Sequence, residues 1–218
     1  LDLLPSFVNP VVTIGTFDGV HLGHQQILSH LKNEALAIHG ETVVITFHPH
    51  PRNIVGDTSG VQLLTTLEEK IALLEAAKIN HLVVVPFDDF FANQSAEEYV
   101  VNFLHQKFKP HTFIIGYDHR FGNKRSGDYQ LLEKLGKQLG FIVKEIPQQL
   151  LNNATISSTQ IRKALLQADL TTATALLGYS YFFSGIVIRG DQIGRTIMGV
   201  LASEDATTVS LNNTVIIH

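Results

Sequence analysis

The sequence predicts an α/β fold built on a parallel β-sheet, and three observations along the chain point to it. Short runs of β-branched and aromatic residues alternate with longer stretches in which apolar residues recur at helical spacing. The short runs are apolar throughout, which is typical of strands covered by helices on both faces. Loops rich in glycine and polar residues follow several of these runs. Strands and helices that alternate in this way form parallel sheets with right-handed crossovers.

The strands of the predicted sheet are short and lie throughout the first two thirds of the chain. The first is predicted at residues 11–14, where an apolar run ends at a glycine. Four more are predicted at residues 43–47, 82–85, 112–115 and 141–143. Because the carboxyl ends of parallel strands meet at one edge of the sheet, a ligand is expected there, where the strand order reverses.

The predicted helices begin at recognisable capping sequences. Thr66 with Glu69, and Ser95 with Glu98, form capping boxes ahead of periodic apolar positions. A third helix is predicted between residues 126 and 140, where a glycine stops it. The paired glutamates of both capping boxes are expected on solvent-facing sides of their helices.

Composition limits the class of protein. The chain has 218 residues, of which 44% are hydrophobic, enough for one substantial domain and a smaller second one. A net charge of -4 argues against a broad surface for nucleic acid. The absence of cysteine excludes disulfides, thiol catalysis and cysteine-based zinc sites. Neither a membrane-spanning apolar run nor a signal peptide is seen, so a soluble, cytoplasmic protein is expected.

The first loop carries the most informative pattern of the chain. After Gly15, two histidines stand three residues apart, His21 and His24, with Gly23 between them, at the start of an amphipathic segment. A helix N-terminus attracts anions, and glycine lets the backbone approach a phosphate closely. The pair alone is also compatible with one core and one surface histidine. The pair also resembles half of a metal site, but the sequence has no second His or Cys cluster at a spacing that would complete the ligand set.

Polar and basic residues also follow three later strands. Each group has a simpler interpretation: a rigid proline turn, a solvated loop, or the N-cap of a helix. Hydroxyls, free N–H groups and a guanidinium together suit a pyrophosphate, which favours an anion site. The groups are Pro49, His50, Pro51 and Arg52; Arg120, Lys124 and Arg125; and Ser157, Ser158, Thr159 and Arg162.

Four stretches together resemble a known family. Residues 15–24, 47–52, 116–128 and 156–162 stand in the order and with spacings similar to those of the bacterial bifunctional riboflavin kinase/FMN adenylyltransferase family, which has a Rossmann-like nucleotidyltransferase domain with a His-x-Gly-His motif. The resemblance covers roughly residues 10–180. It implies transfer of AMP from ATP to FMN, giving FAD and pyrophosphate.

The resemblance also implies roles for individual residues, with Mg²⁺ bridging the phosphates and no dedicated metal ligands in the protein. The catalytic residues it implies are His21, His24 and Arg162. The ATP- or phosphate-binding residues are Gly15, Thr16, Phe17, Asp18, Gly23, Ser157, Ser158 and Thr159. The flavin-binding residues are Pro49, His50, Pro51, Arg52, Asp118, Arg120, Phe121 and Arg125.

The pattern changes near residue 180, so domains are expected at residues 1–179 and 180–218. Residues 185–197 resemble the entry to the family's riboflavin kinase β-barrel, which would phosphorylate riboflavin to FMN. The Gly-Phe-Pro-Thr-Ala-Asn motif that normally follows is replaced by residues 198–202. Either the kinase module is degenerate, or the sequence carries only parts of it. The strand-like composition of residues 198–202 and 213–218 favours the second explanation.

Two other functions remain open from the sequence. Other His-x-Gly-His enzymes, such as cytidylyltransferases and pantetheine-phosphate adenylyltransferases, share the first and last motifs but are not expected to carry both middle loops. A sensor on the same fold would bind ATP or FMN without turnover.

Overall fold

A computed structural model describes residues 4–55, 61–117, 119–147 and 156–185, together with the backbone of residues 214–216. Five parallel strands form the sheet in the order β5-β4-β1-β2-β3. Its strands are β1 (Val11–Ile14), β2 (Thr42–His48), β3 (His81–Pro86), β4 (Thr112–Gly116) and β5 (Ile142–Ile146). A short strand, β6 (Thr214–Ile216), pairs in parallel with the outer edge of β3.

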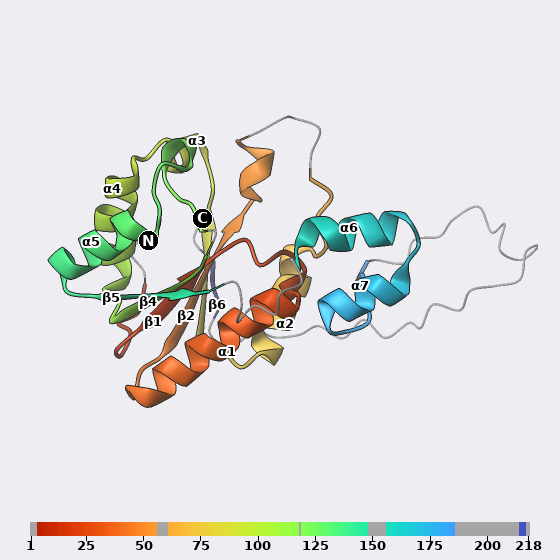
Figure 1. Cartoon of the computed structure of the whole chain (residues 1–218), viewed down its shortest axis with the longest axis horizontal. Helices are drawn as coiled ribbons and strands as arrows, with labels where there is room; N and C mark the ends of the chain where they lie inside the picture. Colours follow the sequence, from red (N-terminus) through yellow and green to blue (C-terminus); the bar gives the residue numbers. More distant parts are fainter. Residues whose placement is uncertain (1–3, 56–60, 118, 148–155, 186–213, 217–218) are drawn as a thin grey trace, which may run out of the picture.

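Helices cover both faces of the sheet (Figure 1). One face packs against α1 (Leu22–Ala37) and α2 (Leu67–Ala76). The other packs against α4 (Ala96–Glu98), which continues into the π-helical η3 (Tyr99–Phe108), and against α5 (Tyr129–Leu139). Val11 and Val12 are successive residues of β1, and they are fully buried on opposite faces of the sheet. Because both faces are covered, β1 does not alternate between apolar and polar residues. The α/β prediction is confirmed.

The short elements lie in the connections between strands and helices. They are η1 (Asp18–Val20), η2 (Pro51–Asn53), α3 (Asp89–Ala92) and η4 (Asn123–Arg125). Both predicted capping boxes are present, at the starts of α2 and α4. The third predicted helix is α5, which is N-capped by Asp128 and ends at Gly140 in a left-handed conformation.

A helical hairpin stands beside the sheet and completes the described fold. It consists of α6 (Ser158–Leu166) and α7 (Leu170–Leu177) (Figure 1). Its apolar faces form a separate small cluster with Leu64 from the loop before α2. Gly178 ends α7 with a φ of 78°, and a Cβ there would lie 2.5 Å from the side chain of Leu22. The hairpin is therefore packed closely against the start of α1.

The structure corrects two expectations about burial. β5 was expected to be covered on both faces, but it is an edge strand, and Ile142 is 49% exposed. Glu69 was expected to face solvent, yet it is only 5% exposed, because it closes the capping box and accepts hydrogen bonds from Ser184. The expected kinase barrel falls largely on residues 186–213, outside the described residues, and its last expected strand contributes β6 to the main sheet.

Candidate functional site

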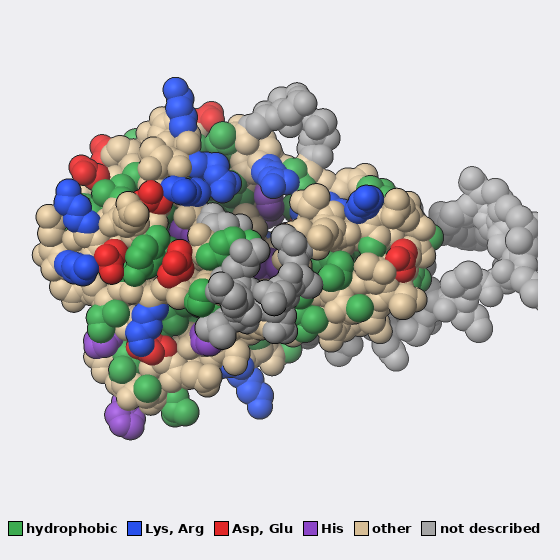
Figure 2. Space-filling view, viewed as in Figure 1, with side chains coloured by type: hydrophobic (Ala, Val, Ile, Leu, Met, Phe, Trp, Pro, Cys, Tyr) green, Lys and Arg blue, Asp and Glu red, His purple; other side chains and the backbone are tan. Residues whose placement is uncertain are grey.

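A cleft of about 450 Å³ opens at the carboxyl end of the sheet, beside β1, β2 and β4. β1 lies between β4 and β2, so the cleft occupies the point at which the strand order reverses, as predicted. Figure 2 shows Lys and Arg side chains close to histidines across the upper middle of this face. The cleft is lined by Thr16, His21, Gly23, His24, Ile27, His50, Pro51, Arg52, Gly116, Tyr117, Arg125, Ile156, Ser157, Ser158, Thr159 and Arg162.

The cleft brings together most of the residues singled out from the sequence. The three residues expected to be catalytic all line it, as do five of those expected to bind phosphate. The residues that do not line it are Gly15, Phe17 and Asp18 of the phosphate set, and Pro49, Arg120 and Phe121 of the flavin set. Asp118 lies outside the described residues.

Four lining residues were given no individual role from the sequence: Ile27, Gly116, Tyr117 and Ile156. Gly116 is the last residue of β4, Tyr117 directly follows it, and Ile156 directly precedes the serine pair, so all three lie within the 116–128 and 156–162 stretches that the sequence singled out. Tyr117 is 40% exposed and gives the cleft an aromatic surface.

The histidine pair sits where β1 turns into α1. His21 is the N-cap of α1, and its Nδ1 accepts a hydrogen bond from the backbone N–H of His24 at 3.4 Å. The two imidazole rings stack with centroids 3.7 Å apart, and Phe17 packs against the ring of His24. Because Nδ1 of His21 is an acceptor, the proton of the neutral ring is assigned to Nε2.

Both imidazoles are neutral near pH 7. Burial lowers the pKa of His21 to about 4. Burial also lowers the pKa of His24 well below its usual value, and the adjacent imidazole acts in the same direction. His24 Nδ1 is buried without a hydrogen-bond partner among the described residues. The pair therefore offers N–H donors to a ligand, and it does not supply a standing positive charge.

The backbone leading into the pair is strained. Phe17 and Val20 have φ angles of 47° and 34°, unusual for bulky and β-branched residues, and Gly19 between them has a φ of 76°. A Cβ on Gly19 would also lie 2.7 Å from the side chain of Leu64, so glycine is required there.

Side chains from distant segments hold this turn in place. Gly19 N–H donates to Thr65 Oγ1 at 3.2 Å, and Gly19 C=O accepts from the hydroxyl of Tyr179 at 2.5 Å. Gln25 Nε2 donates to the carbonyls of Val20 and Leu177, at 3.0 and 2.9 Å. The turn that presents His21 is thus fixed from the loop before α2, from α1 and from the end of α7.

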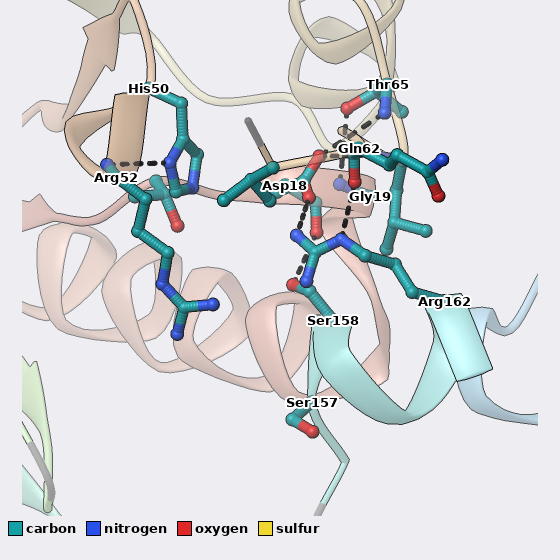
Figure 3. A network of polar contacts seen from close by, with 12 residues as sticks. Asp18, Gly19, His50, Arg52, Gln62, Thr65, Ser157, Ser158 and Arg162 are labelled. Atoms are coloured by element: carbon teal, nitrogen blue, oxygen red, sulfur yellow. Dashed lines mark hydrogen bonds and ion pairs between the residues drawn. The ribbon is translucent and has the colours of Figure 1, made fainter. Parts of the chain in front are cut away.

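Asp18 and Arg162 form a buried ion pair beneath the cleft (Figure 3). Arg162 Nη2 lies 2.5 Å from Asp18 Oδ2, and the side chains are 16% and 2% exposed. Asp18 Oδ1 accepts from the backbone N–H groups of Leu64 and Thr65, and Arg162 Nε donates to Gln62 C=O at 2.6 Å. The carboxylate of Asp18 is therefore occupied within the protein, and it orients the guanidinium that lines the cleft.

Two helices begin at the cleft and point their first turns into it. His21 caps α1, and Ser157 caps α6 by accepting a hydrogen bond from Gln160 N–H at 3.3 Å. The first N–H groups of each helix have no intrahelical partner, so they are available to an anion. The hydroxyl of Ser158 donates to Asp18 C=O at 3.0 Å. This hydrogen bond joins the start of α6 to the histidine turn, the strained segment of residues 17–21 that leads into the histidine pair.

The opposite side of the cleft carries cations without such partners. Arg52 follows the proline turn after β2, and Arg125 lies in the 122–126 loop. Figure 3 shows the guanidinium of Arg52 extending toward the serines of α6. Within the described part of the chain, neither guanidinium is recorded in a hydrogen bond or ion pair. Both are available to an anionic ligand.

The segment after α7 returns to the site. The hydroxyl of Tyr179 binds Gly19, and Ser184 donates through both its N–H and its hydroxyl to Glu69 Oε1. Burial raises the pKa of Tyr179 to about 12, so its hydroxyl stays protonated and remains a donor.

Comparison with known proteins agrees with this geometry. The FAD synthetase family profile matches residues 6–160. The chain belongs to the FAD synthetase family. It is 42% identical over 195 residues to a bifunctional riboflavin kinase/FMN adenylyltransferase of Buchnera aphidicola, covering 87% of this chain and 61% of that protein. Proteins of the same name from Haemophilus influenzae and Bacillus subtilis are 42% and 36% identical, covering 85% and 95% of this chain.

These relatives are longer than this chain, which spans 60% and 64% of the Haemophilus and Bacillus proteins. The fold also resembles a crystal structure described as a macrolide-efflux protein from Streptococcus pneumoniae, with a TM-score of 0.72 and 25% identity. That match covers 89% of this chain and 62% of the other. No described helix of this FAD synthetase family member is long and apolar enough to cross a membrane.

Proposed function

We propose that this FAD synthetase family domain transfers AMP from ATP to FMN, releasing pyrophosphate and forming FAD. The observation that carries the proposal is the convergence of two helix N-termini, a neutral histidine pair and three arginines on one cleft. Such a cleft suits a chain of phosphates. The relatives named as FMN adenylyltransferases support FMN as the acceptor.

The reaction needs alignment more than it needs a base. A phosphate oxygen of FMN attacks the α-phosphorus of ATP, a new P–O bond forms, and the bond from the α-phosphorus to the bridging oxygen of the β-phosphate breaks. The leaving pyrophosphate takes that electron pair. The second pKa of a phosphomonoester is about 6, so the attacking phosphate is largely ionised at neutral pH. The protein must hold the two phosphates in line and stabilise the charge that develops.

The described residues divide this work between the two sides of the cleft. Neutral His21 and His24 would donate N–H groups to the oxygens of the α-phosphate, as an oxyanion hole does. The free N–H groups at the start of α6, with Thr159 and Arg162, would hold the departing pyrophosphate. Arg52 and Arg125 would bind FMN from the opposite side.

Mg²⁺ would be carried by the phosphates, whose charge it neutralises. Among the described residues, no group of three or more His, Cys, Asp or Glu side chains is placed to hold a metal ion. The carboxylate of Asp18, beneath the cleft, is bound to Arg162 and to backbone N–H groups.

A second activity is proposed for the intact protein. Residues 180–218 resemble the start and parts of a riboflavin kinase barrel, and the relatives named above are bifunctional. We therefore propose that residues 1–179 form the adenylyltransferase domain, and that riboflavin phosphorylation belongs to a module that begins near residue 180.

The deciding experiment supplies Mg-ATP with FMN, and separately Mg-ATP with riboflavin, and resolves the flavins by chromatography. FAD and pyrophosphate from FMN are expected. FMN or FAD from riboflavin would show that the kinase module is present and active. If ATP and FMN bind but FMN remains unchanged, the domain is a sensor. If FMN does not bind, other phosphorylated acceptors of His-x-Gly-His enzymes become the candidates.

A further inference from the structure

Lys70 places an amino group directly behind the cleft. It lies on α2, is 6% exposed and is absent from the cleft lining. Its Nζ donates a hydrogen bond to Thr46 Oγ1 on β2 at 3.4 Å. Thr46 Oγ1 in turn donates to Thr16 C=O at 3.2 Å, and Thr16 lines the cleft. The amino group therefore lies behind the cleft wall and is connected to it through Thr46 and Thr16.

The charge of Lys70 is not neutralised by an ion pair in the described part of the chain, where no carboxylate oxygen is recorded within 4.0 Å of Nζ. Glu69, next to it in sequence, binds Thr66 and Ser184 instead. Asp18 attracts Lys70 but is directly paired with Arg162. Among the other cationic groups on this side of the cleft, the two histidines are neutral and Arg162 is paired with Asp18.

Burying this ammonium opposes folding. An amino group removed from water without an ion pair loses hydration that one long hydrogen bond does not replace. Burial accordingly lowers the pKa of Lys70. Burial is the main cause of the lowered pKa of His24 and of His50, and the positive charge of Lys70 acts in the same direction on both of these cleft-lining side chains. A group that costs stability and projects a field into the cleft is suited to act on a ligand there.

We propose that Lys70 is an electrostatic positioning residue: from behind the wall it supplies uncompensated positive charge that attracts the phosphates of ATP and stabilises pyrophosphate as it leaves. It touches neither, and acts through the low-dielectric wall formed by Thr46 and Thr16. The assignment of the anion rests on the proposed function, whereas the electrostatic effect applies to any phosphate in the cleft.

The test compares Lys70→Met, which removes the charge, with Lys70→Arg, which keeps it. Lys163→Met removes one charge from an exposed position on α6, next to Arg162, and serves as the matched control. The measurements are the Kd of inorganic pyrophosphate by calorimetry, kcat/KM for ATP in FAD formation, and Tm.

In Lys70→Met we expect pyrophosphate to bind about tenfold more weakly and kcat/KM for ATP to fall about tenfold to a hundredfold. We expect Tm to stay constant or rise, because an unpaired buried charge has been removed. Lys70→Arg should recover most of the lost affinity, and Lys163→Met should stay within about twofold of the wild type. A weaker affinity for pyrophosphate together with a constant or higher Tm would indicate an electrostatic role.

An unchanged pyrophosphate Kd in Lys70→Met would overturn the proposal. Loss of affinity together with a lower Tm, or without recovery in Lys70→Arg, would also overturn it by assigning Lys70 a structural role. The calorimetry does not depend on FAD formation. A wild-type protein that binds pyrophosphate but makes no FAD would contradict the proposed function, while the comparison of Kd values would still decide the role of Lys70.

Discussion

The two sides of the cleft are built in opposite ways. On one side, the histidine turn and the start of α6 form a network in which Asp18, Gly19 and Arg162 each bind partners far away in sequence. On the other side, the guanidinium groups of Arg52 and Arg125 line the cleft with no recorded partner in the described ranges. One side is fixed before a ligand arrives, whereas the other retains hydrogen-bonding capacity for the ligand.

This difference separates orientation from binding. A strained turn with φ angles of 47° and 34° at Phe17 and Val20 persists only because surrounding contacts enforce it. Such a turn can hold an imidazole in a productive position without reorganisation during the reaction. For an unpaired guanidinium, binding a phosphate costs less free energy, since no internal ion pair has to break. Substitutions on the fixed side should therefore affect stability and kcat, and those on the open side KM.

The largest effect is expected from breaking the ion pair of the fixed side. Asp18→Asn keeps an oxygen that can accept from Leu64 and Thr65 but leaves the buried Arg162 uncompensated. The free energy of unfolding should fall by about 3–5 kcal/mol, measured by urea denaturation. Lys137→Ala, which removes an exposed ion pair on α5, is the control and should change stability little. Equal losses in the two variants would contradict the comparison.

The next largest effect is expected at His24. His24→Ala removes a donor of the proposed oxyanion site, and kcat for FAD formation should fall about 10²–10³-fold. His30→Ala alters an exposed histidine on the same helix and should leave kcat unchanged. A loss below tenfold would remove His24 from the mechanism.

The neutral state of His21 predicts how stability depends on pH. Its folded-state pKa of about 4 lies below the unfolded value of 6.5, so the unfolded chain binds an additional proton between these values. The contribution of neutral His21 to the free energy of unfolding is therefore fully present above pH 6.5. It decreases as pH falls toward 4, by about 3 kcal/mol in total. Thermal unfolding of wild type and His21→Gln from pH 7 to 4.5 tests this, since the variant should show a shallower decline. Parallel declines would show that His21 is not the titrating group.

The smallest effects are expected on the open side. Arg52→Gln and Arg125→Gln each remove one proposed charge-assisted contact with FMN, so KM for FMN should rise about tenfold while kcat stays nearly constant. Lys134→Gln, at an exposed position on α5, is the control for net charge. A fall in kcat without a change in KM would place these arginines in the fixed network.

The sequence predicted the elements whose information is local. Continuous apolar runs indicated the strands, and the capping boxes at Thr66 and Ser95 marked helix starts that the structure confirms. Sequence position after each strand also indicated the residues that line the cleft, including His21, His24 and Arg162. Local patterns were sufficient because a capping box closes between residues three apart, and a short apolar run is itself the signal of a strand.

The remaining features depend on contacts that no local pattern records. Asp18 reaches Leu64 across 46 residues and Arg162 across 144, so its use as an internal anchor could not be read from its motif. The burial of Glu69 depends on Ser184, 115 residues away. The exposure of β5 follows from strand order, which places it at an edge. Likewise, the neutrality of the histidines comes from packing, whereas the motif alone suggested only that they face a phosphate.

The segment after α7 determines where the proposed adenylyltransferase domain can be separated from the rest of the chain. The family match ends at residue 160, and the boundary predicted from sequence falls at 179 and 180. Yet residues on both sides of that boundary contact the rest of the domain. Tyr179 donates a hydrogen bond to Gly19 in the histidine turn, and Ser184 donates one to Glu69 on α2. An excised or transplanted domain that keeps the geometry of its cleft must therefore run through residue 184. Any module grafted after that point begins next to the helix that carries Lys70.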